Sequence, residues 1–273
     1  MLVPCAASWA VNATTFPCLT LLAIGHASTG IDLLARTERD EVPLILELLS
    51  QRACPASVLF LLRSQALGLL ASSGIALAVA AMPEEERTRA LPLALAASAA
   101  VSLRQPQLSA APPAAVVLRC GTLLCACAAY RRASPRPGHV PFLRQRRRAA
   151  AAGRIVLGVG LAGVVGPRAC SGRSFACLGQ ARPLLAQALR CSAAQLLPLG
   201  VGFLELSRSR GRSRRLLASA VAAGSGAQLA LLLGPHAHAL HRGARWALML
   251  MHAASAFAAT AAAASASTRA TKL

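Results

Sequence analysis

The sequence has few charged residues, few aromatic residues and almost no lysine. Charged residues make up 14% of the 273 residues, aromatic residues make up 3%, and Lys272 is the only lysine. An average soluble domain is about 25% charged. The low charge of this chain, together with 55% hydrophobic residues, fits neither a soluble nor a disordered chain. The scarcity of aromatic residues also argues against nucleic-acid binding, because single strands are bound by stacking on aromatic side chains. A helical membrane protein remains.

Long apolar segments follow one another along the chain. A transmembrane helix needs roughly 20 mostly apolar residues, and about eight segments approach that length. They cover residues 6–34, 56–82, 90–108, 114–130, 149–167, 184–206, 216–234 and 244–265. We therefore predict an all-α, polytopic membrane protein with about eight transmembrane helices, whose partner is the lipid bilayer.

The segments divide into two tandem four-helix units. We predict the first unit at residues 1–130 and the second at 149–265, with an Arg- and Pro-rich cytoplasmic hinge at 131–148 and a short tail at 266–273. A shift of 127 residues aligns the second to fourth segments with the sixth to eighth, and about 14 of 69 positions are then identical. Composition alone gives roughly eight identities, so the argument also needs the shared segment order and loop charge. The alternative is eight unrelated Ala- and Leu-rich helices.

A slightly longer shift aligns the first segment with the fifth. It pairs Gly25 with Gly158 and Gly30 with Gly163. Small residues let membrane helices approach closely, and we expect these glycines, with Gly160, Gly224 and Gly226, to lie at helix contacts. The segment from Gly158 to Gly163 also matches the dinucleotide-binding pattern GxGxxG. Without a βαβ context inside an apolar segment, helix packing is the better interpretation.

The arginine distribution predicts the orientation. Cytoplasmic loops carry an excess of Lys and Arg. With eight spans and the hinge inside, the inner segments hold 17 of the 29 basic residues, the outer segments nine, and three lie within spans. Both termini are therefore predicted to be cytoplasmic, and the basic run from Arg144 to Arg148 is predicted to contact anionic lipid. No targeting motif identifies the membrane.

Arg63 and Arg190 occupy equivalent positions inside the second and sixth segments. A charge inside a membrane helix is costly and is usually functional, with a partner in the bundle. Acidic residues near the spans are Asp32, Glu47 and Glu205. The other interpretation is that each arginine, about two turns from its helix end, extends to the headgroups.

Four histidines, His236, His238, His241 and His252, lie in the hairpin formed by the last two segments. His238, His241 and His252 would share one face of a continuous helix, where imidazoles bind metal ions or haem iron. The alternative is that His238 and His241 belong to a loop and contact headgroups, since no carboxylate lies nearby to orient them. The sequence favours this second interpretation, without a cofactor.

Nine cysteines are present, but they form no CxxC pair. Cys120, Cys125 and Cys127 lie in an apolar segment, where they pack as small side chains. Cys170 and Cys177 share a predicted outer loop and are candidates for a disulfide on an oxidising side.

Function follows only coarsely from these patterns. No HExxH or Walker A motif occurs, which favours a non-enzymatic protein: a structural subunit, or a carrier or channel for a small solute, with membrane-protein partners or as a homo-oligomer. In the second case Arg63 and Arg190 would face a polar or anionic solute. The alternative function is a membrane-embedded redox or metal- or haem-binding enzyme that uses the C-terminal histidines.

Overall fold

The structure is a computed structural model that describes residues 17–38, 55–83, 86–103, 113–132, 144–175, 182–209 and 211–270. This part of the chain is helical and has no strand, apart from an isolated bridge between Phe175 and Leu240. The all-α fold class predicted from the sequence is confirmed for these residues.

The helices follow the apolar segments in order. They are α2 (Pro17–Glu38), α4 (Pro55–Ala80), α5 (Ala90–Leu103), α6 (Pro113–Arg132), α7 (Arg144–Val165), α8 (Pro167–Ser174), α9 (Arg182–Ala194), α10 (Leu196–Arg208), α11 (Gly211–Leu233), the 3₁₀ helix η3 (Pro235–Ala239) and α12 (Arg242–Ala270). α6 and α7 extend into both ends of the predicted hinge, and the part of the hinge at 133–143 lies outside the described residues.

The predicted segment 184–206 is not one continuous helix. It is interrupted by a turn at Gln195, between α9 and α10. Pro198 explains the interruption, because proline lacks an N–H and its ring clashes with the carbonyl four residues earlier, which belongs to Ala194 at the end of α9. The predicted outer loop near Arg168 is also partly helical, since it contains α8.

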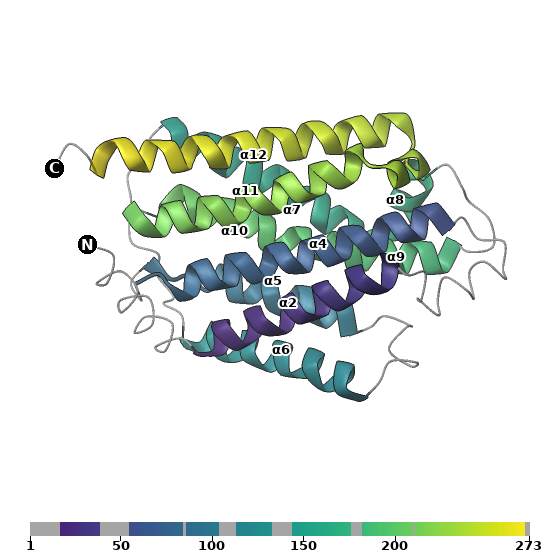
Figure 1. Ribbon diagram of the computed structural model, residues 1–273, viewed down its shortest axis with the longest axis horizontal. Helices are drawn as coiled ribbons and strands as arrows, with labels where there is room; N and C mark the ends of the chain where they lie inside the picture. Colours follow the sequence, from purple (N-terminus) through teal and green to yellow (C-terminus); the bar gives the residue numbers. More distant parts are fainter. Residues whose placement is uncertain are drawn as a thin grey trace.

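The long helices lie side by side in one elongated bundle (Figure 1). The long helices alternate in direction, with α9 and α10 following one another in the same direction, so the α4–α5 and α10–α11 connections and the end of α12 lie at one end of the bundle. η3 and α8 lie at the opposite end. α4 is central: 67% of its apolar window is buried, whereas only 22% of the α12 window is.

Five helices in the described part of the chain are long and apolar enough to cross a membrane. These are Pro17–Thr37, Ala56–Ala80, Arg147–Val165, Gly211–Leu233 and Arg242–Ala264. Large apolar side chains on their outer faces are exposed, including Ile24, Ile155, Leu250 and Phe257. Such exposed apolar surface suits a hydrocarbon environment. These features indicate a membrane-embedded helical protein.

The helix contacts form two similar groups. α2 packs against α4 and α6, and α5 packs against α6. In the second half α7 packs against α9, α10 and α12, and α11 packs against α12. Between the groups, α4 packs against α9, α10 and α11, and α5 packs against α9 and α10. α4 and the α9–α10 pair therefore form the centre of the bundle.

Glycines allow the closest contacts between helices. A Cβ added to Gly163 would lie 2.4 Å from the Cβ of Ala193, and one added to Gly30 would lie 3.0 Å from the Ala66 carbonyl oxygen. Gly160 and Gly224 also lie at close contacts. Gly158 and Gly226 do not, since an added Cβ would meet nothing within 4 Å, so the expectation of close packing is wrong at these two positions.

Two contacts at the centre join α4 to the α9–α10 pair directly. A Cβ added to Gly68 would lie 2.4 Å from the Cβ of Gln195, and a Cβ added to Gly202 would lie 3.2 Å from Cδ1 of Ile75. The positions within each helix are seven residues, or about two turns, apart. One face of α4 is thus in contact with one face of α10 and the turn before it.

Candidate functional site

A cavity of about 210 Å³ lies between α4 and the helices of the second half. Side chains from α7, α8, α9, α11 and α12 complete its wall, together with Leu196 of α10. The wall is mostly apolar, with Phe60, Leu61, Leu189 and Leu248 among its members, and no Lys, Arg, Asp or Glu lines it. Cavities with an apolar wall and a few converging polar groups are typical ligand sites.

Three polar side chains from three helices are joined at this cavity. Gln228 Nε2 donates to the Ser64 carbonyl oxygen at 2.8 Å, and Ser64 Oγ donates to Gln228 Oε1 at 3.0 Å. Ser192 Oγ donates to Ser64 Oγ at 2.9 Å. In a membrane interior such groups need partners, and this network ties α4, α9 and α11 together. It also gives one wall of the cavity a small neutral polar patch.

His252 of α12 is the second polar feature of the wall. Its side chain is buried, with 3% exposure, and its Nδ1 has no hydrogen-bond partner among the described residues. A neutral imidazole offers one donor and one acceptor nitrogen. Leaving such a group unpaired in an apolar interior costs free energy. A ligand in the cavity with one hydroxyl or amide group would supply the missing partner.

The other two histidines of the predicted metal site lie elsewhere. His238 is exposed in η3, with Nδ1 in contact with the Pro235 carbonyl oxygen, and His241 is exposed in the connection before α12. A continuous helix through His238, His241 and His252 is therefore not formed. Within the described residues, no three His, Cys, Asp or Glu side chains are grouped as metal ligands.

Arg63 and Arg190 are both partly buried, and neither lines the cavity. Arg190 Nε donates to the Val164 carbonyl oxygen at 3.1 Å, and Nη1 donates to Gln187 Oε1 at 3.4 Å. Arg190 and the exposed Arg168 line a separate pocket of about 300 Å³ where α7 meets α8. The Nε of Arg63 is buried and lacks a partner in the described part of the chain.

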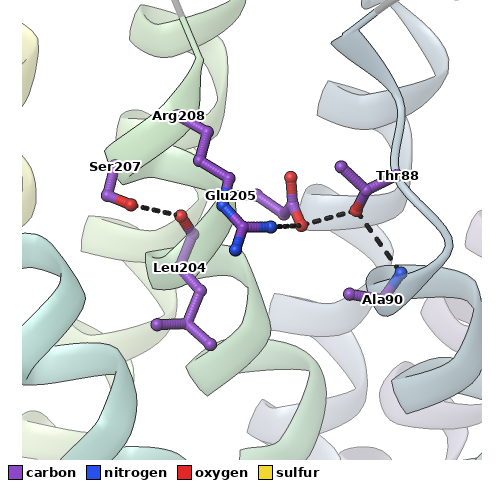
Figure 2. Close-up of polar contacts among 6 residues, drawn as sticks. All are labelled: Thr88, Ala90, Leu204, Glu205, Ser207 and Arg208. Carbon is purple, nitrogen blue, oxygen red and sulfur yellow. Dashed lines mark hydrogen bonds and ion pairs between the residues drawn. The ribbon is translucent and has the colours of Figure 1, made fainter. Parts of the chain in front are cut away.

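The acidic residues near the spans pair with other groups. Asp32 forms an exposed ion pair of 3.0 Å with Arg36, one turn along α2. Glu205 is buried, and its Oε1 accepts a hydrogen bond of 2.5 Å from Thr88 Oγ1 and lies 3.8 Å from Arg208 Nη1 (Figure 2). Glu205 thus joins the end of α10 to the α4–α5 connection. Glu47 lies outside the described residues.

The candidate disulfide involves a residue outside the described part of the chain, Cys177. Cys170 lines the cavity as a free thiol, and its Sγ lies 3.5 Å from the Ala162 carbonyl oxygen. Cys125 and Cys120 are likewise free.

Ser64, Ser192 and Gln228 are the site residues that sequence reasoning missed. The charged residues and the histidines drew attention because their cost in a membrane is highest. A glutamine inside an apolar segment is also costly when unpaired, so Gln228 was a detectable signal. Its partners could not be identified, because they lie on other helices.

Comparison of the chain with protein-family models, with curated proteins and with solved structures gave no match.

Proposed function

We propose that the protein is a non-enzymatic membrane carrier for a small, largely apolar solute, built of two tandem four-helix units with eight transmembrane segments. The observation that carries the proposal is the mostly apolar cavity, whose wall includes a buried imidazole with an Nδ1 that has no hydrogen-bond partner among the described residues. The solute would occupy this cavity, with its single polar group at His252 or at the network of Ser64, Ser192 and Gln228.

The central contacts support the two units. Under the shift of 127 residues, Gly68 corresponds to Gln195 and Ile75 to Gly202, and each of these residues contacts its own counterpart. When two similar units are related by a two-fold axis, residues on the axis contact their equivalents. Two such pairs, two turns apart on the same helices, are what an axis parallel to α4 and α10 would produce.

The glycine contacts support the same register independently. Gly30 approaches Ala66 in the first unit, and Gly163 approaches Ala193 in the second. The shift of 133 residues relates the two glycines, and the shift of 127 relates the two alanines. Parallel repeats of this kind, with an axis along the membrane normal, occur in transporters.

The size of the cavity limits the solute. An engineered apolar cavity of about 150 Å³ holds benzene, which has six heavy atoms, so about 210 Å³ would admit roughly eight. Because no Lys, Arg, Asp or Glu lines it, the solute would be uncharged. This differs from the anionic solute that Arg63 and Arg190 suggested from the sequence, since both arginines lie outside the lining.

Binding of 4-fluorobenzyl alcohol to the protein in lipid nanodiscs tests the proposal. The probe has about the required size and one hydroxyl group, and ¹⁹F NMR distinguishes protein-bound from lipid-dissolved molecules. We expect one saturable bound resonance. Replacing Ala162, which lines the cavity on α7, by phenylalanine should weaken binding at least tenfold, because the ring would fill the space.

The matched control is Ala151→Phe, which adds the same ring at an exposed position on α7, three turns from Ala162 and outside the cavity lining. This variant should bind the probe as the native protein does. Absence of a saturable resonance from the native protein would overturn the carrier proposal in favour of a structural subunit. Haem or metal absorbance in protein purified from native membranes would favour the redox alternative instead.

A further inference from the structure

A second, much smaller cavity lies in the first half of the molecule. Its volume is about 20 Å³, and it lies between α2, α4, α5 and α6. His26, Thr29, Gln65 and Leu69 contribute to its wall. His26 is buried, and its Nδ1 has no partner among the described residues. A space of this size holds one water molecule, which needs two to four polar partners.

The two cavities are related by the same residue shifts that relate the two units. On α2 and α7, His26 corresponds to Val159 and Thr29 to Ala162. On α4 and the α9–α10 pair, Gln65 corresponds to Ser192 and Leu69 to Leu196. All four residues of each set line their own cavity. The linings from α2 and α4 therefore agree in register with the helix contacts, whereas Ala99, Ser102 and Thr122 of α5 and α6 have no counterpart in the second lining.

We infer that the molecule contains two equivalent ligand sites, of which the first is closed by His26, Thr29 and Gln65 and holds only water, while the second is open to the solute. This inference rests on the proposed function. Three pairs of residues would determine whether a site holds only water or the solute: His26 and Val159, Thr29 and Ala162, and Gln65 and Ser192.

The side-chain sizes account for the difference in volume. Histidine, threonine and glutamine together carry roughly eight more side-chain heavy atoms than valine, alanine and serine. This is about the number of heavy atoms that the second cavity admits as a ligand. In the first unit, the additional side-chain atoms would therefore occupy the volume that a solute would occupy in the second unit. The polar atoms of these three residues also suit water rather than an apolar molecule.

Reciprocal exchange of the three residues tests the inference. The opening variant carries His26→Val, Thr29→Ala and Gln65→Ser, and the closing variant carries Val159→His, Ala162→Thr and Ser192→Gln. With 4-fluorobenzyl alcohol in nanodiscs, we expect one bound ¹⁹F resonance for the native protein, two for the opening variant and none for the closing variant. A protein with all six changes should bind one equivalent again, at the first site.

The native site serves as an internal control for folding of the opening variant. If its resonance persists and no second one appears, the equivalence of the sites is overturned while the carrier proposal stands. If native protein and opening variant both lack a bound resonance, the carrier proposal itself fails, and the inference fails with it. Loss of the native resonance from the opening variant alone would also overturn the inference, because independent sites would not respond in this way.

Discussion

At the cavity, the described polar contacts between helices are made by neutral side chains rather than by arginines. Gln228 and Ser64 form two hydrogen bonds across α11 and α4, whereas Arg190 reaches the Val164 carbonyl near the end of α7. Basic side chains commonly satisfy the free carbonyls at helix C-termini. Arg190 therefore has a structural explanation that requires no solute, and the cavity is defined by its uncharged groups.

Removal of the Gln228 side-chain amide should destabilise the protein. Gln228→Leu deletes both bonds to Ser64, and interhelical hydrogen bonds in membrane proteins contribute about 0.6 kcal/mol on average and up to about 1.7. We expect the free energy of unfolding in mixed detergent micelles to fall by about 1–2 kcal/mol.

A double-mutant cycle with Ser64→Ala separates this interaction from general effects of the substitution. Because the two residues bond to each other, the double variant should lose less stability than the two single variants together. Additive losses would show that the contact between Gln228 and the Ser64 hydroxyl contributes nothing.

At the scale of helices, close approach depends on which glycine faces a neighbour. Gly158 and Gly163 lie on the same helix, but only Gly163 contacts α9. Helical periodicity separates the two by 500° of rotation, which places them on different faces. Sequence alone identified both as small residues, and only the packing of α7 against α9 distinguishes them.

Gly163→Ala should weaken the contact of α7 with α9. The added methyl group would lie 2.4 Å from the Cβ of Ala193, so one helix must move. Overpacking of this kind costs about 1–3 kcal/mol, measured as the free energy of unfolding. Gly158→Ala is the matched control on the same helix, and we expect its stability to stay within about 0.5 kcal/mol of native. Equal effects of both substitutions would contradict the arrangement of α7.

At the scale of the whole molecule, the apolar segments predicted where helices occur, because a run of apolar residues needs no tertiary information. The interruption at Gln195 was not predicted, although Pro198 marks it, because the segment around it is apolar enough to be taken as one span. The cavity depends on which faces of α4, α9, α11 and α12 are in contact. The residue pattern of a single segment does not predict which face of another helix it contacts.

Orientation in the membrane is the remaining property of the whole molecule. The exposed Arg147 and Arg148 begin α7, and the α4–α5 and α10–α11 connections lie at one end of the bundle (Figure 1). The positive-inside rule would place that end in the cytoplasm, against anionic lipid. Reporters fused after Val140 and at the C-terminus should both read cytoplasmic, whereas a reporter between α8 and α9 should read exoplasmic.

The difference between the numbers of basic residues on the two sides predicts how a variant without the run from Arg144 to Arg148 would be oriented. Replacing the four arginines between positions 144 and 148 by glutamine leaves 13 basic residues on the inner side against nine outside. Because orientation follows the bias over all short loops, both reporters should stay cytoplasmic in this variant. In nanodiscs of mixed composition, the variant should also be less enriched in anionic lipid than the native protein, because each arginine near the surface contributes about 1 kcal/mol to this attraction. A reporter after Val140 that reads exoplasmic in the native protein would reject the orientation.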